Sequence, residues 1–355
     1  MCVLAKGVVV VPSPSLLGGP WLGATRASAL QRVGNRPIVC HVLSALQEAG
    51  VAEVAIVAPP EAAEEVAACV RSEGSPGVDV HTLAIEQPGD GDRTWRAVAR
   101  WLGDAPAIVH RADGLLGQPL LPFVTLREEE TLDALLLVPA RHSDAPPHLE
   151  LVSSKRNGAG ADRALPVSHA SIGVCLLAPG TLSRLSEELS PSEVDLGTLA
   201  AQLPRHGART SVRTARKWRH FDGDIRDLLD LNRTVLEALE AETTDRARSN
   251  HFEGQAAIHP TATVRSSVIV GPVIVGAGAV IVDSYIGPHT SIAERVRIEG
   301  SELERSIVLA DAHVLHVGGR LVGSVVGRGA RVFRDFSVPR ALRLHVGDGA
   351  EVALC

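Results

Sequence analysis

The last third of the chain carries a repeat with a period close to six residues, and this feature constrains the fold most strongly. Its units begin with an aliphatic residue followed by glycine, as at Val270-Gly271, Val275-Gly276, Ile286-Gly287 and Val326-Gly327. Other aliphatic residues fall between them at similar spacing: Ile258, Val264, Ile281, Ile292, Val296 and Ile298. This period is typical of a parallel β-helix. We predict that residues 258–332 stack as coils, with glycine at tight corners where a side chain would clash.

The composition describes an ordinary folded protein. Its 355 residues suffice for two domains with cores of their own, and 45% of them are hydrophobic against 21% charged. A net charge of -6 gives no electrostatic reason to expect a nucleic-acid partner. No apolar run approaches membrane-spanning length, so no membrane partner is expected either. The cysteines are scattered without metal-binding spacing, at Cys2, Cys40, Cys69, Cys175 and Cys355. We expect a cytoplasmic protein with reduced thiols.

The region before the repeat alternates between buried strands and amphipathic helices. Continuous apolar runs predict strands at 8–11, 54–57, 107–110, 134–138 and 171–177, and helical periodicity predicts helices at 37–50, 61–72, 94–102 and 224–242. This alternation predicts an α/β domain with a doubly wound, mostly parallel, Rossmann-like sheet. Such sheets bind nucleotides at the carboxyl ends of their strands.

The predicted domain boundary lies in a polar stretch without apolar periodicity. We expect an α/β domain at residues 1–242, a linker at 243–257 and a β-helix domain at 258–355. A short β-helix leaves end coils that need cover, which favours self-association into a homo-oligomer.

Several motifs resemble the sugar-1-phosphate nucleotidyltransferases, most closely their long-form glucose-1-phosphate thymidylyltransferases. In the repeat region the resemblance rests on residues 284–292 and 301–307, with 339–340 and 346–348 near the end. In the α/β region it rests on residues 33–38, 86–88, 112–116 and 172–174, together with Trp218 and Leu231-Asn232-Arg233. The resemblance spans nearly the whole chain and implies the family's α/β domain followed by a left-handed β-helix.

The resemblance also implies an activity and a set of site residues. The expected substrates are a nucleoside triphosphate and a sugar 1-phosphate or sugar-like cyclitol 1-phosphate, with Mg²⁺ as cofactor. A Gly-rich loop containing Gly18 and Gly19 would cradle the triphosphate, with Arg26 and Arg36 offsetting its charge. Gln87 would contact the nucleobase, and Lys155 and Gly173 the sugar phosphate. Asp113 matches one metal-binding aspartate, and Asp222 lies one residue from the position of the second.

The catalytic signature departs from the family at four positions. Trp21 lies near an expected arginine, Ser28 replaces an expected lysine, Ser154 replaces a glutamate, and Phe221 takes the position of the second metal-binding aspartate. Because each lost charge contact commonly costs about 3 kcal/mol in transition-state stabilisation, four such losses would abolish turnover unless other residues compensate.

Three functions therefore stay open. The first is a divergent nucleotidyltransferase, which the matches at Asp113, Gln87 and Lys155 favour. The second is a non-catalytic paralogue that serves as a regulatory or structural subunit beside an active paralogue. A third interpretation makes the β-helix an acyltransferase with His289, His313 or His316 as general base. Lone histidines on coil corners are more often solvent-facing turn residues, so this interpretation has the least support.

Overall fold

The computed structural model describes residues 5–12, 27–74, 77–84, 91–139, 150–151, 165–166, 172–185, 195–215, 217–239 and 250–336. These residues form two compact units. The first contains the described residues up to 12, residues 27–30 and the described residues between 37 and 220; the second contains residues 31–36 and those from 221 onwards. No helix in the described part of the chain has both the length and the apolar character needed to cross a membrane.

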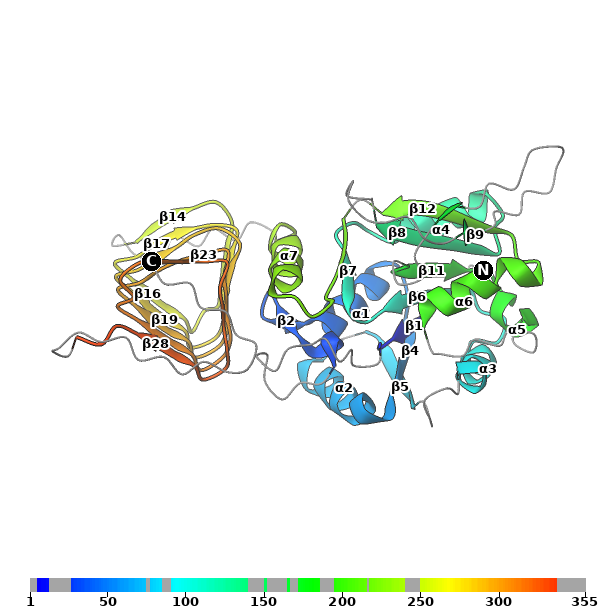
Figure 1. Ribbon diagram of the computed structural model, residues 1–355, viewed down its shortest axis with the longest axis horizontal. Helices are drawn as coiled ribbons and strands as arrows, with labels where there is room; N and C mark the ends of the chain where they lie inside the picture. Colours follow the sequence, from blue (N-terminus) through cyan, green and yellow to red (C-terminus); the bar gives the residue numbers. More distant parts are fainter. Residues whose placement is uncertain are drawn as a thin grey trace. The chain divides into compact units, whose positions relative to one another are not determined.

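The first unit is built on a seven-stranded sheet (Figure 1). Its strands, in spatial order, are β12 (Thr210–Ala215), β8 (Ala134–Pro139), β11 (Val174–Leu177), β6 (Ala107–Arg111), β1 (Lys6–Val10), β4 (Glu53–Ala58) and β5 (Asp79–Ala84). All neighbouring pairs are parallel except those made by β11, which runs antiparallel to both β6 and β8. The predicted doubly wound, mostly parallel sheet is confirmed.

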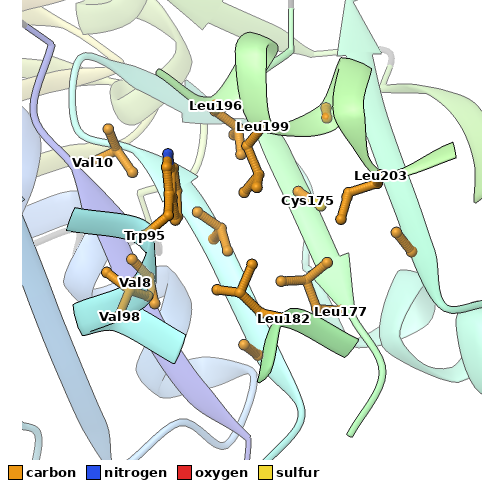
Figure 2. Close-up of a cluster of buried hydrophobic side chains, with 14 of the residues drawn as sticks. Val8, Val10, Trp95, Val98, Cys175, Leu177, Leu182, Leu196, Leu199 and Leu203 are labelled. Carbon is orange, nitrogen blue, oxygen red and sulfur yellow. The ribbon is translucent and has the colours of Figure 1, made fainter. Parts of the chain in front are cut away.

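Helices cover both faces of this sheet. On one face, α3 (Gly91–Leu102), α5 (Thr181–Leu185) and α6 (Leu196–Gln202) supply Trp95, Leu182 and Leu199 to a buried cluster over the central strands, which Figure 2 shows. The other helices are α1 (Ile38–Glu48), α2 (Pro60–Glu73), which contacts β4 and β5, and α4 (Leu121–Glu129), which contacts β8 and β11. Because helices cover both faces of the sheet, its apolar strands are buried on both sides, which is typical of parallel sheets.

Several shorter elements accompany these, most of them in the first unit. Two short antiparallel pairs join β7 (Gly114–Leu116) with β13 (Trp218–His220) and β9 (Glu150–Leu151) with β10 (Leu165–Pro166). The strands β2 (Arg32–Val33) and β3 (Arg36–Pro37) flank a two-residue turn, and 3₁₀ turns occur at Ser28–Leu30 and Pro204–His206.

The second unit contains a left-handed parallel β-helix made of three five-stranded parallel sheets. The first sheet stacks β14 (His251–Glu253), β17 (Val268–Val270), β20 (Tyr285–Ile286), β23 (Glu302–Glu304) and β26 (Arg320–Val322). The second stacks β15 (Ala256–Ile258), β18 (Val273–Val275), β21 (Thr290–Ile292), β24 (Ile307–Val308) and β27 (Val325–Val326). The third stacks β16 (Thr263–Arg265), β19 (Val280–Val282), β22 (Arg297–Glu299), β25 (His313–Leu315) and β28 (Arg331–Phe333). The expected stack of coils is confirmed.

The interior of the β-helix explains the repeat. Ile269, Ile286 and Leu303 stand in register on successive coils and are fully buried. A Cβ added to Gly271 would lie 1.9 Å from the backbone oxygen of Gln255, which confirms that a side chain would clash there. Positive φ angles, by contrast, fall mainly on corner residues other than these repeat glycines, such as Asp283 at 48°. Glycine at positions 271 and 276 therefore allows close stacking of coils rather than a left-handed backbone, whereas a Cβ at Gly327 would meet nothing within 4 Å.

A ladder of buried serines ties three coils together along one corner. The Ser267 hydroxyl accepts a hydrogen bond from the Ser284 amide at 3.2 Å, and the Ser284 hydroxyl accepts one from the Ser301 amide at 3.3 Å. Each of the three hydroxyls also donates to the carbonyl two residues before it. The corner's polar backbone groups are thus paired without solvent.

Helix α7 (Ile225–Leu236) belongs to the second unit, where it contacts β2 and β21. The side chain of Asp224 caps it by accepting a hydrogen bond from the Arg226 amide at 2.9 Å. The sequence predicted a helix over 224–242; the structure ends it at Leu236. Residues 240–249 lie outside the described residues, so the linker at 243–257 and the domain limits at 242 and 258 stay predictions.

Candidate functional site

The carboxyl ends of β1 and β6 define the candidate site. These strands pair in parallel, with Val10 opposite Arg111, and the Ala112 amide donates to the Val10 carbonyl at 2.8 Å. From β1 the sheet continues in one direction through β4 and β5 and in the other through β6, so the strand order reverses here. In open α/β sheets, ligands bind in the crevice at such a switch point. The segment from Arg111 to Gly114 is therefore placed where a nucleotide would bind.

Arg111 and Asp113 form a bidentate ion pair at this point. The Arg111 Nε donates to Asp113 Oδ1 at 2.9 Å, and Nη2 donates to Oδ2 at 2.7 Å. Only 13% of the Arg111 side chain and 4% of the Asp113 side chain are exposed. Parallel double hydrogen bonds of this kind are among the stronger and more directional contacts that a carboxylate makes. The pair fixes both side chains at the strand end.

His110 lies just before this pair and is buried in β6. The backbone carbonyl of Arg111 can only accept, so the His110 Nδ1–H donates to it, at 2.7 Å. Burial lowers the pKa of His110 from 6.5 to about 4, against the opposing effects of that hydrogen bond and the Asp113 charge; the Arg111 charge lowers it slightly further. The ring packs against the Trp218 indole with centroids 5.5 Å apart. His110 is thus a neutral imidazole near pH 7.

Two glycines hold the Trp218 indole between them. A Cβ added to Gly173 would lie 2.4 Å from an indole carbon, and one added to Gly114 would lie 2.5 Å from another. Trp218 itself is only 3% exposed. The Gly173 carbonyl accepts a hydrogen bond from the Arg111 amide at 3.0 Å. The indole, Gly173 and the ion pair therefore form one packed assembly.

Acid is expected to destabilise the first unit through His110. The folded state keeps His110 neutral down to about pH 4, whereas the unfolded chain binds a proton below about 6.5. Stability is therefore complete above pH 6.5 and falls as the pH drops from 6.5 to 4, by up to about 3 kcal/mol. Urea unfolding at several pH values should show this slope and a flatter one for His110→Phe. A matching change at exposed His251, His251→Gln, should leave the slope intact; equal slopes for the wild type and His110→Phe would contradict the assignment.

The chain is similar to several known proteins over nearly its whole length. It is 28% identical over 340 residues to a glucose-1-phosphate thymidylyltransferase of Streptomyces antibioticus, covering 93% of this chain and 94% of the relative. It is 29% identical over 333 residues to a protein of the same name from Streptomyces griseus, covering 91% and 92%. A low-salt glycan biosynthesis nucleotidyltransferase of Haloferax volcanii is 23% identical over 342 residues, covering 93% and 95%.

The chain is similar over nearly its whole length to sugar-1-phosphate nucleotidyltransferases. The named relatives are all nucleotidyltransferases, in agreement with the leaning of the sequence towards an enzyme of that type. A Bacillus anthracis protein described as a glucose-1-phosphate thymidylyltransferase, crystallised with sucrose, shares the fold, with a TM-score of 0.52 at 16% identity over 67% of this chain and 98% of that one. No family model matches the chain.

Most of the site residues that the family resemblance implies lie outside the described residues. These are Gly18, Gly19, Arg26, Gln87 and Lys155. The structure places the others on two units. Asp113 and Gly173 lie at the switch point of the first unit. Arg36 lies half-buried in β3, and Asp222 is exposed before α7, where its amide donates to the Asp227 carboxylate at 3.3 Å; both belong to the second unit.

The nucleotidyltransferase family implies Mg²⁺, and the residues around Asp113 do not fit such an ion in the arrangement described. A magnesium ligand must turn a carboxylate oxygen towards the ion, at about 2.0–2.1 Å. Both oxygens of Asp113 already accept hydrogen bonds from Arg111, and only 4% of the Asp113 side chain is exposed, so little of the carboxylate is left accessible to an ion. Among the residues that the structure describes, no group of three or more His, Cys, Asp or Glu side chains could hold a metal ion.

The family pattern draws attention to Asp113 but gives no reason to examine Arg111 or His110. Both side chains belong to β6, an otherwise apolar strand. A basic residue at the last position of a buried strand, two residues before an aspartate, is the signal from which the pair could have been inferred. Residues that directly follow or end such a strand face the ligand edge of the sheet.

Proposed function

We propose that this chain is a divergent sugar-1-phosphate nucleotidyltransferase. It joins a nucleoside triphosphate to a sugar 1-phosphate, or to a sugar-like cyclitol 1-phosphate, and releases pyrophosphate. The observation that carries the proposal is its similarity to thymidylyltransferases over more than nine-tenths of both chains. The switch point between β1 and β6, where charged side chains lie at the end of a buried strand, supports the proposal, because ligands bind at such points in open α/β sheets.

The chemistry asks the protein mainly to position two anions. A phosphate oxygen of the acceptor attacks the α-phosphorus of the triphosphate, a new P–O bond forms, and the bond to the β-phosphate oxygen breaks as pyrophosphate leaves. Catalysis of such transfers rests on orientation and on charges placed near the reacting oxygens. In this proposal Lys155 holds the acceptor phosphate, Arg26 and Arg36 offset triphosphate charge, Gly18 and Gly19 allow close backbone approach, Gln87 contacts the base and Gly173 borders the acceptor.

The second candidate is a non-catalytic paralogue that serves as a subunit. The bidentate pairing of Asp113 with Arg111 favours it, because that pair engages the carboxylate which the family uses for its metal ion. A homo-oligomer, or an assembly with an active paralogue, is expected under either candidate, and light scattering of the purified chain would test it.

Pyrophosphate release separates the two candidates. We expect release when dTTP, ATP, GTP, CTP and UTP are screened against glucose 1-phosphate and cyclitol 1-phosphates. Lys155→Ala should raise the KM for the acceptor by ~10²-fold with a smaller effect on the KM for the triphosphate, because lysine acts there as a point charge on the acceptor. Lys217→Ala, at an exposed lysine, is the control and should leave both values unchanged. No release with any pair would refute the enzyme and leave the paralogue.

A further inference from the structure

We infer that the guanidinium of Arg111 takes the place of a divalent cation at Asp113, so that this site binds the phosphates of a nucleoside triphosphate without Mg²⁺. The inference rests on the proposed function for the identity of the ligand. It assigns Arg111 as a phosphate-binding residue and Asp113 as the residue that positions it. These roles differ from the one that the family resemblance implies for Asp113, which is to bind Mg²⁺.

The geometry of the pair is the first step. Two hydrogen bonds of 2.9 and 2.7 Å join the guanidinium edge to both carboxylate oxygens. Both side chains are nearly buried, and the backbone of Arg111 is held on each side, by pairing with Val10 in β1 and by the hydrogen bond that its amide donates to the Gly173 carbonyl. A metal ion at Asp113 would have to share a buried carboxylate whose two oxygens already accept hydrogen bonds from a cation, and displacing that cation would be costly.

Charge gives the second step. Arg111 is permanently protonated. A divalent cation placed on the same carboxylate would therefore meet a like charge at close range, in a setting where burial weakens screening. The carboxylate has one negative charge to share, and Arg111 already offsets it. The arrangement favours one fixed cation at the strand end rather than two.

The position of the pair is the third step. Arg111 is the last residue of β6 and pairs with Val10 of β1. It therefore lies at the carboxyl ends of the strands, where phosphates bind in this class of fold. Guanidinium groups bind phosphate through planar, directional hydrogen bonds. Unlike a metal ion, a guanidinium is part of the chain and needs no further protein ligands to hold it in place. The neutral His110, which precedes Arg111 in β6, adds no competing positive charge near pH 7. Arg111 can therefore place, as part of the chain, a guanidinium hydrogen-bond donor where the family resemblance implies Mg²⁺.

The first arm of the test uses Mn²⁺ alone as a probe of the metal site, read by electron paramagnetic resonance on the full-length chain. We expect no Mn²⁺ binding by the wild type or by Asp113→Asn, and binding by Arg111→Ala, in which the carboxylate is released. Arg71→Ala, at an exposed arginine on α2, is the control and should behave as the wild type. Mn²⁺ binding by the wild type that disappears in Asp113→Asn would overturn the inference.

The second arm measures the affinity of dTTP, ATP, GTP, CTP and UTP by calorimetry, in Mg²⁺ and in EDTA. For the wild type the Kd should change by less than about tenfold between the two, whereas Arg111→Ala in EDTA should bind ~10²-fold more weakly. Loss of wild-type binding in EDTA would overturn the inference. Thermal melting checks that each variant folds; if Arg111→Ala does not, the wild type and Asp113→Asn still decide the Mn²⁺ arm.

The two proposals fail in different ways. Binding that is insensitive to EDTA, without pyrophosphate release, would refute the proposed enzyme and keep the inference. Pyrophosphate release together with Mn²⁺ bound at Asp113 would refute the inference and keep the enzyme. No triphosphate binding in either buffer would refute both.

Discussion

Replacing Asn232 with leucine is expected to destabilise the second unit by about 4 kcal/mol, because two buried groups and one half-buried carbonyl would lose their partner, at about 1–3 kcal/mol for each buried group. Asn232 lies on α7 and is fully buried. Its Oδ1 accepts from the Gly34 amide at 2.8 Å and from the Ser291 hydroxyl at 2.6 Å, and its Nδ2 donates to the His289 carbonyl at 3.1 Å. Leucine has a similar size but can satisfy none of these.

The network explains why a helix, a turn and the β-helix form one unit. The turn between β2 and β3 has positive φ at Gly34 and Asn35, which turns the Gly34 amide towards α7. The Asn35 side chain donates in addition to the Ile292 carbonyl of β21 at 2.7 Å. Because Asn232 bonds to the turn on one side and to the coil at Ser291 on the other, its loss should loosen both contacts together.

Urea unfolding and hydrogen exchange would measure the effect. Asn232→Leu should lower the free energy of unfolding and remove the protection of the Gly34 amide against exchange. The control on the same helix is Asp230→Asn, which breaks an exposed ion pair with Arg305 of 2.9 Å and should cost less than about 1 kcal/mol. Combined with Ser291→Ala, the Asn232→Leu effect should be less than additive. Equal costs for Asn232→Leu and Asp230→Asn would contradict the proposed network.

The strands of the central sheet could be predicted where both of their faces are buried. The apolar runs at 8–11, 54–57 and 107–110 correspond to β1, β4 and β6, because a parallel strand covered on both faces reads as continuous hydrophobic sequence. The edge strand β5 was not predicted. Its residues, Asp79–Ala84, alternate in character and include exposed side chains, since only one neighbour pairs with it.

The packing of the site could not be predicted from the sequence in the same way. That Asp113 follows a strand is a local property, and so the motif led to it. The pairing of Arg111 with Asp113 also has a local signal, but the burial of that pair depends on how β6 is held between β1 and β11. The contact of Trp218 with Gly173 joins residues far apart in the chain. A family motif identifies residues that recur at fixed positions in the sequence. It does not show which side chains pack together, because that packing depends on the surrounding fold.

Replacing Gly173 with alanine is expected to destabilise the first unit by about 3 kcal/mol, because the new methyl group would overlap the buried Trp218 indole. The added Cβ would lie 2.4 Å from the ring, and the indole has little room to move because Gly114 packs against it as well. Since the Gly173 carbonyl accepts the Arg111 amide, the displacement should also disturb the ion pair and weaken triphosphate binding.

Urea unfolding of Gly173→Ala, with the triphosphate affinity measured alongside, would test this. Gly327→Ala is the control, because a Cβ at Gly327 has open space around it and should cost little. A Gly173→Ala variant as stable as Gly327→Ala would contradict the predicted clash.

A second substitution separates the structural explanation for Gly173 from the functional one. If glycine is required only because the indole lies against it, Trp218→Leu should relieve the clash, and the cost of the double variant should be well below the sum of the two single costs. Triphosphate affinity and acceptor use should then recover in step with stability. If Gly173 is instead required for close approach of the acceptor, as the family resemblance implies, stability should recover while the KM for the sugar 1-phosphate stays raised, because the methyl group would still border the acceptor. Recovery of both stability and acceptor use would show that glycine is required at position 173 because of Trp218. Recovery of stability alone would show that it is required for the approach of the substrate.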